Sequence, residues 1–447
     1  MRPRRAFVLH QDILLEHACW LIALGIALNA GYAALHFSFG FGEANFLSGP
    51  EDRFADLVKV ALSFKGYTAG LAATSEFQAW PALYKDYLLH NPYLGIEGLA
   101  TGRLTHLHHP PLSQLSFNLC AMLIVLGKSA TSVIWLWFGL YAACVAWLAT
   151  TYRKCITVRR PSVVPLLILC FFSYPALQVF IRGNYHAGFS SILIAVFMIS
   201  CFGQRKVSWP GILALALAMN FRPVALVFLL AVPLIVGWRR SIVPVLAVIA
   251  LAGAILLAAL VVENAVYPAY ELNSFLQGLN NYRNLYIVGP NGDAGNASLW
   301  ALIKNGARMS GTLTFYHDEL YRLFIAMSIF AILMAWRSLR ARVNPTQAGP
   351  LVLVVLYILL SPVCAEYHLL VCIAPLAILS LQQNVAQFDA KVVFWASVVL
   401  LVPKNYTFID GLSVQTLINP MTLLISLVLL QLARQAEPKQ DKGAIAL

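Results

Sequence analysis

The chain contains few charged residues, and this shortage excludes a soluble globular protein. Asp, Glu, Lys and Arg make up 11% of the 447 residues, whereas 60% are hydrophobic. A soluble domain is typically about one quarter charged. Apolar runs recur between residues 12 and 433, and a helix that crosses a bilayer requires roughly 20 such residues. The composition therefore indicates an integral membrane protein.

Other patterns are also absent, and each absence removes a class of protein. The apolar runs do not alternate with polar residues at every second position, as barrel strands would, so the spans are predicted to be helices. The eight cysteines show no CxxC spacing. The net charge of +12 comes from short basic clusters between apolar runs, which indicates cytoplasmic loops and not nucleic-acid binding. Four cysteines lie within apolar runs and are interpreted as small core residues: Cys120, Cys144, Cys170 and Cys201.

The basic clusters set the predicted orientation, because they hold loops in the cytoplasm. With Arg2, Arg4 and Arg5 inside, the first helix, over about 12–37, leads outside. Residues 112–126 are apolar but short for a span. Only if they lie along the membrane surface do the clusters at 153–160 and 337–342 also fall inside. The sequence therefore predicts a juxtamembrane helix over 112–126.

The predicted fold is all-α and polytopic, with about twelve transmembrane helices in one domain over 1–447 and outer loops at about 38–128 and 263–316. The stretch 209–236 is expected to form two short helices, because Pro223 and the residue before it break helical geometry. No internal repeat is visible, in contrast to many secondary transporters. The expected spans are 12–37, 129–151, 161–181, 187–203, two within 209–236, 241–262, 317–336, 347–363, 367–382, 391–403 and 413–433.

The first outer loop contains residue types that can carry catalysis. Asp56 lies at the head of a predicted amphipathic helix, where a carboxylate could act as general base toward an acceptor hydroxyl. The alternative is that it is a solvated loop residue. His106, His108 and His109 suggest a metal site, but the segment has no HExxH or DxD pattern, so we favour loop histidines and expect no metal. His109 could still contact a phosphate.

Polar residues at the predicted outer membrane edge form a second group of candidates. Arg182, with Asn184 after it, ends one predicted span, and Arg222 lies at the predicted helix break. A guanidinium at headgroup level binds phosphate through paired hydrogen bonds, although snorkelling explains each arginine alone equally well. Glu366 and His368 separate two apolar runs at the same edge, and ionisable residues in such positions are functional candidates.

Taken in order along the chain, these segments resemble the integral membrane glycosyltransferases of fold type C. The closest resemblance is to glycosyltransferase family 87, the polyprenyl-phosphate-mannose-dependent alpha-mannosyltransferases, and it covers about residues 50–380. Leu57 replaces an aromatic residue of the family pattern, His109 a tyrosine and Arg222 a lysine. The corresponding elements are Asp56-Leu57, Asn91-Pro92-Tyr93, His109-Pro110-Pro111-Leu112, Gly183-Asn184, Arg222-Pro223, and Ser361-Pro362 followed by His368.

The resemblance implies a function and a set of site residues. A hexose, with mannose as the first expectation, would move from a polyprenyl-phosphate donor to a lipid or glycan acceptor in one inverting displacement. Asp56 would be the general base, and neither a sugar nucleotide nor a cofactor would take part. The site would face the periplasm or exterior of a bacterial inner membrane. The residues expected to bind the donor phosphate or the rest of the substrate are His109, Arg182, Asn184, Arg222, Glu366 and His368.

A transporter or flippase for a lipid-linked saccharide is the main alternative, since it also needs arginines at an amphiphile site. Such a protein would favour charges deep within its spans, whereas this chain has them at span ends, which favours the enzyme. An inactive scaffold of the same fold is a third possibility. The expected partners are a polyprenyl-phosphate sugar, a lipid or glycan acceptor and membrane lipids, without nucleic acid.

Overall fold

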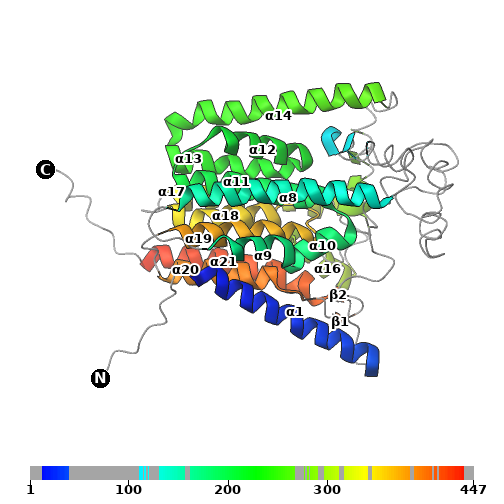
Figure 1. Cartoon of the computed structure of the whole chain (residues 1–447). Coiled ribbons are helices and arrows are strands. Elements are labelled where there is room, and N and C mark those ends of the chain that lie inside the picture. The colour runs from blue at the N-terminus through cyan, green and yellow to red at the C-terminus, as the bar shows by residue number, and fades with distance from the viewer. Residues whose placement is uncertain are drawn as a thin grey trace, which may run out of the picture.

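The protein is described by a computed structural model, in which apolar helices lie side by side as a bundle (Figure 1). The chain is described over residues 13–39, 110–113, 115–116, 119, 130–156, 162–266, 276, 279–280, 282–289, 296–311, 317–340, 345–382, 387–404, 407–409 and 412–436.

Six helices of the described residues are long and apolar enough to cross a membrane. A seventh candidate is the pair α9 (Val164–Phe172) and α10 (Tyr174–Arg182), which bends by 46° between its two helices. A helical membrane protein is thus confirmed, while the twelve spans expected from the sequence stay a prediction. The six are α1 (Leu14–Phe39), α8 (Ala130–Cys155), α11 (Tyr185–Met198) with the π-helix η3 (Ile199–Gly203), α14 (Trp238–Val266), α17 (His317–Arg340) and α21 (Val414–Ala436).

Shorter helices complete the bundle. The predicted break within 209–236 is confirmed, because a helix ends at Phe221 and a 3₁₀ helix begins at Pro223. Residues of the predicted second outer loop form a helix of their own, α16 (Leu299–Met309). The shorter apolar elements are α12 (Trp209–Phe221), η4 (Pro223–Leu230) leading into α13 (Ala231–Val236), α18 (Pro345–Leu359), the 3₁₀ helix η6 (Glu366–Cys372) leading into α19 (Ile373–Leu381), and α20 (Gln387–Leu401).

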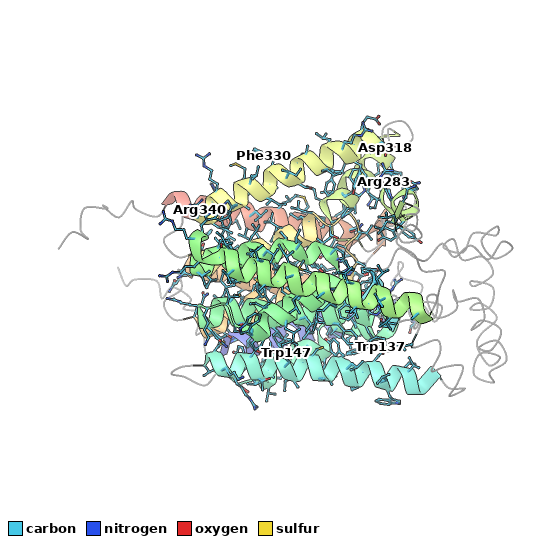
Figure 2. The ribbon with its side chains drawn as sticks, turned by 90° about the horizontal axis from the view of Figure 1, so that it is seen from above. Trp137, Trp147, Arg283, Asp318, Phe330 and Arg340 are labelled. Atoms are coloured by element: carbon cyan, nitrogen blue, oxygen red, sulfur yellow. The ribbon has the colours of Figure 1, made fainter. Side chains whose placement is uncertain are left out.

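The centre and the periphery of the bundle differ in burial. Every residue of α11 is buried, and so is α19 from Ile373 to Ser380. A helix that is apolar on all sides requires such an enclosed position. The outer helices α14 and α17 instead expose large apolar side chains, and Figure 2 shows one of them, Phe330, directed away from the bundle. Apolar side chains exposed in this way suit contact with lipid.

Basic residues distinguish one end of the bundle from the other. The last turns of α8 and α17 are basic, and two arginines follow Trp238 at the start of α14. Figure 1 shows these helix termini at the end where α1 begins and α21 ends, which we call the basic end. The opposite end, called the far end, carries α16 and the hairpin of β1 (Thr407–Ile409) and β2 (Leu412–Ser413). The residues of the basic end are Arg153, Lys154, Arg239, Arg240, Arg337 and Arg340.

Close packing joins α8, α10 and α11 next to the far end. The Tyr141 hydroxyl of α8 donates a hydrogen bond of 2.7 Å to the carbonyl of Cys170 in α9. Gly188 of α11 lies against the same tyrosine, so that an added Cβ would be 2.8 Å from Val179 Cγ1 and 3.0 Å from Tyr141 Cε2. Glycine is therefore required at residue 188 by the approach of the neighbouring helices.

Gly188→Ala should lower the thermal midpoint of the detergent-solubilised protein. Overpacking of a filled core costs about 1–3 kcal/mol, and a gain of about 1 kcal/mol in helix propensity offsets part of it. Gly139→Ala in α8 is the matched control, because a Cβ at residue 139 meets nothing within 4 Å. Equal midpoints for the two variants would contradict the packing of α8, α10 and α11.

Candidate functional site

The far end brings together four of the residues singled out in the sequence. Arg182 ends α10, Arg222 follows α12, and Glu366 and His368 lie in η6. Arg222 interacts electrostatically with His368, and Arg182 does so with Glu366. Asp56 and His109 lie outside the described residues, so the structure neither joins them to this group nor separates them from it.

Arg222 owes its position to the proline that follows it. The residue before a proline is disfavoured in the α conformation, and Arg222 is extended, with φ −148° and ψ 99°. Its N–H still donates to the carbonyl of Ala218 at 2.8 Å, which closes α12. Pro223 then starts η4. The side chain of Arg222 therefore leaves the backbone at a gap between two helices.

The Arg222 guanidinium is held by neutral acceptors. Its Nη2 donates to Ser361 Oγ at 3.0 Å and to the carbonyl of Val363 at 2.8 Å. The ring of Tyr357 lies 5.7 Å below the guanidinium carbon. Among the described residues, Nε has no hydrogen-bond partner and no carboxylate forms an ion pair with this arginine. The guanidinium is fixed in place, but its charge is not cancelled by a described anion.

The turn that receives Arg222 is held by a segment that the sequence placed in an outer loop. Asn296 Nδ2 donates to the carbonyl of Pro362 at 3.1 Å, and its Oδ1 accepts from the Cys364 N–H at 2.9 Å. Ser298 Oγ donates to the same Pro362 carbonyl at 3.1 Å and also caps α16. The turn over 361–365 is thus fastened by Arg222 on one side and by Asn296 and Ser298 on the other.

His368 is buried behind this turn, with 5% of its surface exposed. Its Nδ1 lies 3.0 Å from the carbonyl oxygen of Ala365. A carbonyl only accepts hydrogen bonds, so Nδ1 carries the proton and Nε2 is the acceptor of the neutral ring. The ring centroid lies 4.5 Å from that of Tyr367. His368 can therefore accept a hydrogen bond through Nε2 on the side of the ring away from Ala365.

Glu366 forms the centre of a second polar group. Tyr174 and Gln415 approach its carboxyl as hydrogen-bond donors, and the charges of Arg182 and Lys404 act on it. Among the described residues, no cation comes close enough to form a direct ion pair with it. One carboxyl oxygen, Oε2, is buried without a hydrogen-bond partner. The carboxyl is thus surrounded by donors and cations while one oxygen is left without a hydrogen bond.

Lys404 belongs to this group, although nothing in its sequence pattern distinguishes it beyond being one basic residue on the predicted outer side. Its side chain is 9% exposed, and Nζ donates to the carbonyls of Val399 and Val402, the second at 2.6 Å. These carbonyls end α20, so the lysine caps the helix. Lys404 lies beyond the last residue of α20, and burial lowers its pKa to about 7, against the opposing effect of Glu366.

Two other predicted features lie at the same end. Asn184 Oδ1 accepts from the Ala187 N–H at 3.3 Å and caps α11, directly after Gly183, whose φ of 68° suits glycine. Ser116, from the predicted juxtamembrane stretch, lies 2.6 Å from His186 Nε2. Ser116 donates its own proton to the carbonyl of Ser113 at 2.6 Å, so His186 is the donor. The stretch therefore contacts the start of α11.

The described residues contain no group of three or more His, Cys, Asp or Glu side chains that could hold a metal ion. The seven described cysteines are free. Cys170 and Cys201 are buried, as the sequence predicts, whereas Cys144 is only partly buried. Comparison of this chain with protein families, with characterised proteins and with solved structures finds no match. The resemblance seen in the sequence therefore stays a prediction.

The burial of Lys404 predicts a pH-dependent stability. Lys404 has a pKa of about 7 in the folded protein and a usual value of 10.5. Between these two pH values the folded state binds fewer protons than the unfolded state, so the free energy of unfolding rises with pH. The thermal midpoint of the native protein relative to Lys404→Met should therefore increase from pH 7 to pH 10, as measured in detergent. Lys391→Met, within α20, is the control. A pH-independent difference between native protein and Lys404→Met would refute the assignment.

Proposed function

We propose that the protein is a membrane glycosyltransferase that moves a hexose, mannose in the first instance, from a polyprenyl-phosphate donor to a lipid or glycan acceptor. Arg222 carries the proposal, because its guanidinium is fixed at a helix break and forms no ion pair with a described carboxylate. A phosphate is a suitable ligand for this guanidinium, because the two groups can form paired hydrogen bonds. The proposed sugar and reaction type come from the resemblance of the sequence motifs, in their order along the chain, to glycosyltransferase family 87.

A lipid-linked phosphate suits this position better than a soluble one. Arg222 lies at the end of α12, which packs against α14, and α14 exposes large hydrophobic side chains over much of its length. A polyprenyl chain can lie against such a surface within the membrane, with its phosphate at the level of the helix ends. The binding energy of the apolar chain then places the phosphate next to Arg222, which by itself would contribute only part of the affinity.

The proposed step is a single inverting displacement. The acceptor hydroxyl attacks the anomeric carbon of the sugar and gives its proton to Asp56, while the bond from that carbon to the phosphate oxygen breaks. The polyprenyl phosphate leaves with the bonding electron pair, so the phosphate changes from a diester with one negative charge to a monoester with up to two. Arg222 stabilises this additional charge, which makes its interaction stronger in the transition state than with the bound donor.

The proposed fold is that of a type C glycosyltransferase in a bacterial inner membrane. The shorter apolar segments α12, η4 with α13, α18, η6 with α19, and α20 would cross together with the longer helices, and residues 112–126 would lie along the surface. The collection of arginines and lysines at the basic end supports a cytoplasmic location for that end. The far end, and the site with it, would face the periplasm or exterior.

Arg222→Ala should weaken the binding of polyprenyl-phosphate mannose by about tenfold or more, because a charge-assisted hydrogen bond contributes roughly 1.5–3 kcal/mol. Arg222→Lys keeps the positive charge but loses the paired N–H donors, so its affinity for the donor should lie between those of native protein and Arg222→Ala. Binding is measured on protein in nanodiscs, after a thermal midpoint has verified the fold. Arg322→Ala, at an exposed residue of α17, is the matched control. Undiminished donor affinity in Arg222→Ala would reject the phosphate role.

Asp56→Asn should lower transfer by about a hundredfold to ten-thousandfold while leaving donor binding intact, because it removes a base but keeps the side-chain size. Release of polyprenyl phosphate in right-side-out vesicles is the measurement, with Asp52→Asn as the control. Normal transfer in Asp56→Asn, together with a loss in Asp52→Asn or Glu366→Gln, would assign the base elsewhere. Donor binding without release by the native protein would favour the saccharide transporter.

A further inference from the structure

The Glu366 carboxyl has an oxygen without a hydrogen bond from any residue that the structure describes. This oxygen, Oε2, is buried, although the residue as a whole is only half-buried. A buried acceptor without a partner is unfavourable. Such groups are normally satisfied by an ordered water or a ligand. The position of this oxygen therefore points to a group that arrives from outside the chain.

Glu366 lies near in the chain to the backbone that Arg222 contacts. The guanidinium donates to the carbonyl of Val363, and Glu366 follows Val363 by three residues in the same turn. Three residues span at most about 11 Å even when fully extended. A phosphate held by Arg222 and the sugar attached to it can therefore lie across this turn, with the sugar next to the carboxyl.

The surroundings of Glu366 determine which groups it can accept. A carboxylate is an acceptor only. Burial disfavours the ionised form of Glu366, and the donors Tyr174 and Gln415 and the cations Arg182 and Lys404 oppose that effect. Hydroxyl groups donate well to an ionised acceptor. An ammonium group would also be attracted by the carboxylate, but it would be repelled by Arg182 and Lys404, the two cations that act on the same carboxyl.

We propose that the Glu366 carboxylate accepts hydrogen bonds from hydroxyl groups of a neutral sugar carried on the lipid phosphate, and that Arg182 and Lys404 select against a sugar that bears an ammonium group. This inference rests on the proposed function for the presence of a lipid-linked sugar. It deepens that function, because it assigns one side chain to sugar selection and defines the substrate class as neutral hexoses.

The first test combines a variant with altered donors. Binding of polyprenyl-phosphate mannose and of analogues that each lack one hydroxyl is measured in nanodiscs, with native protein and Glu366→Gln. For native protein, at least one deoxy analogue should bind about tenfold more weakly, as expected for a hydrogen bond to a charged group. Glu366→Gln should bind polyprenyl-phosphate mannose about tenfold more weakly than native protein does. Its affinity for that deoxy analogue should be no lower than its affinity for polyprenyl-phosphate mannose.

The matched control for this comparison of variants and analogues is Glu319→Gln, which removes a carboxylate from the first turn of α17. This variant should show the same dependence on each hydroxyl as the native protein. If every deoxy analogue lost the same affinity in Glu366→Gln as in native protein, the carboxylate would not contact the sugar and the inference would be overturned.

The second test concerns charge. At pH 6.5, native protein should bind the mannose donor at least tenfold more tightly than an amino-sugar donor on the same lipid phosphate. Lys404→Met should bring the two affinities closer together, whereas Lys391→Met should preserve the preference. A preference that is unchanged in Lys404→Met, or an equal affinity of native protein for both donors, would overturn the selection by charge.

Binding of the sugar-free polyprenyl phosphate separates this inference from the proposed function. Native protein that binds polyprenyl phosphate but shows no dependence on any sugar hydroxyl would overturn the sugar subsite and leave the phosphate site standing. Failure to bind polyprenyl phosphate or any donor would overturn the proposed function and the subsite with it. Sugar-dependent binding without transfer would support the subsite in a transporter.

Discussion

The turn between α18 and η6 imposes the constraint on which the far end depends. Irregular backbone at the edge of an apolar bundle needs hydrogen-bond partners from the protein itself, because lipid supplies none. Arg222 satisfies the carbonyl of Val363, and Asn296 satisfies both the carbonyl of Pro362 and the N–H of Cys364. Two segments that are distant in sequence are thereby fastened to one turn. The helix break after α12, the start of α16 and the start of η6 consequently form one unit.

The same hydrogen bonds explain why the far end can attract an anion. Arg222 and Lys404 both donate to neutral oxygens, a hydroxyl and carbonyls, which do not cancel their charge. Glu366 is the acidic residue that acts on Lys404 and Arg182 from within this group. In a medium of low polarity, such uncancelled charge acts more strongly than it would in water. The arrangement therefore favours a negatively charged group at the membrane edge.

The sequence predicted the parts of this structure that depend on local pattern. Hydropathy located the apolar helices, and Pro223 located the helix break and the arginine before it. The span predicted over 161–181 is instead a bent pair of helices, because Tyr174-Pro175 starts a new helix. Asn296 and Lys404 escaped notice, since their roles come from contacts with distant segments or from burial. The function stays a prediction, because helices and charges define a site but not its substrate.

An arginine at residue 222 can hold the turn over 361–365 and still keep an N–H in a fixed direction, which a lysine could not do. The guanidinium presents five donors in a rigid plane, whereas an ammonium has three donors around one atom. Nη2 alone reaches both Ser361 and Val363, and Nε is left without a partner among the described residues. A lysine that made the same two contacts would retain one donor, without a fixed direction. The arginine can therefore fasten the turn and retain a further N–H, which in the proposed function is the group that binds the phosphate of the donor.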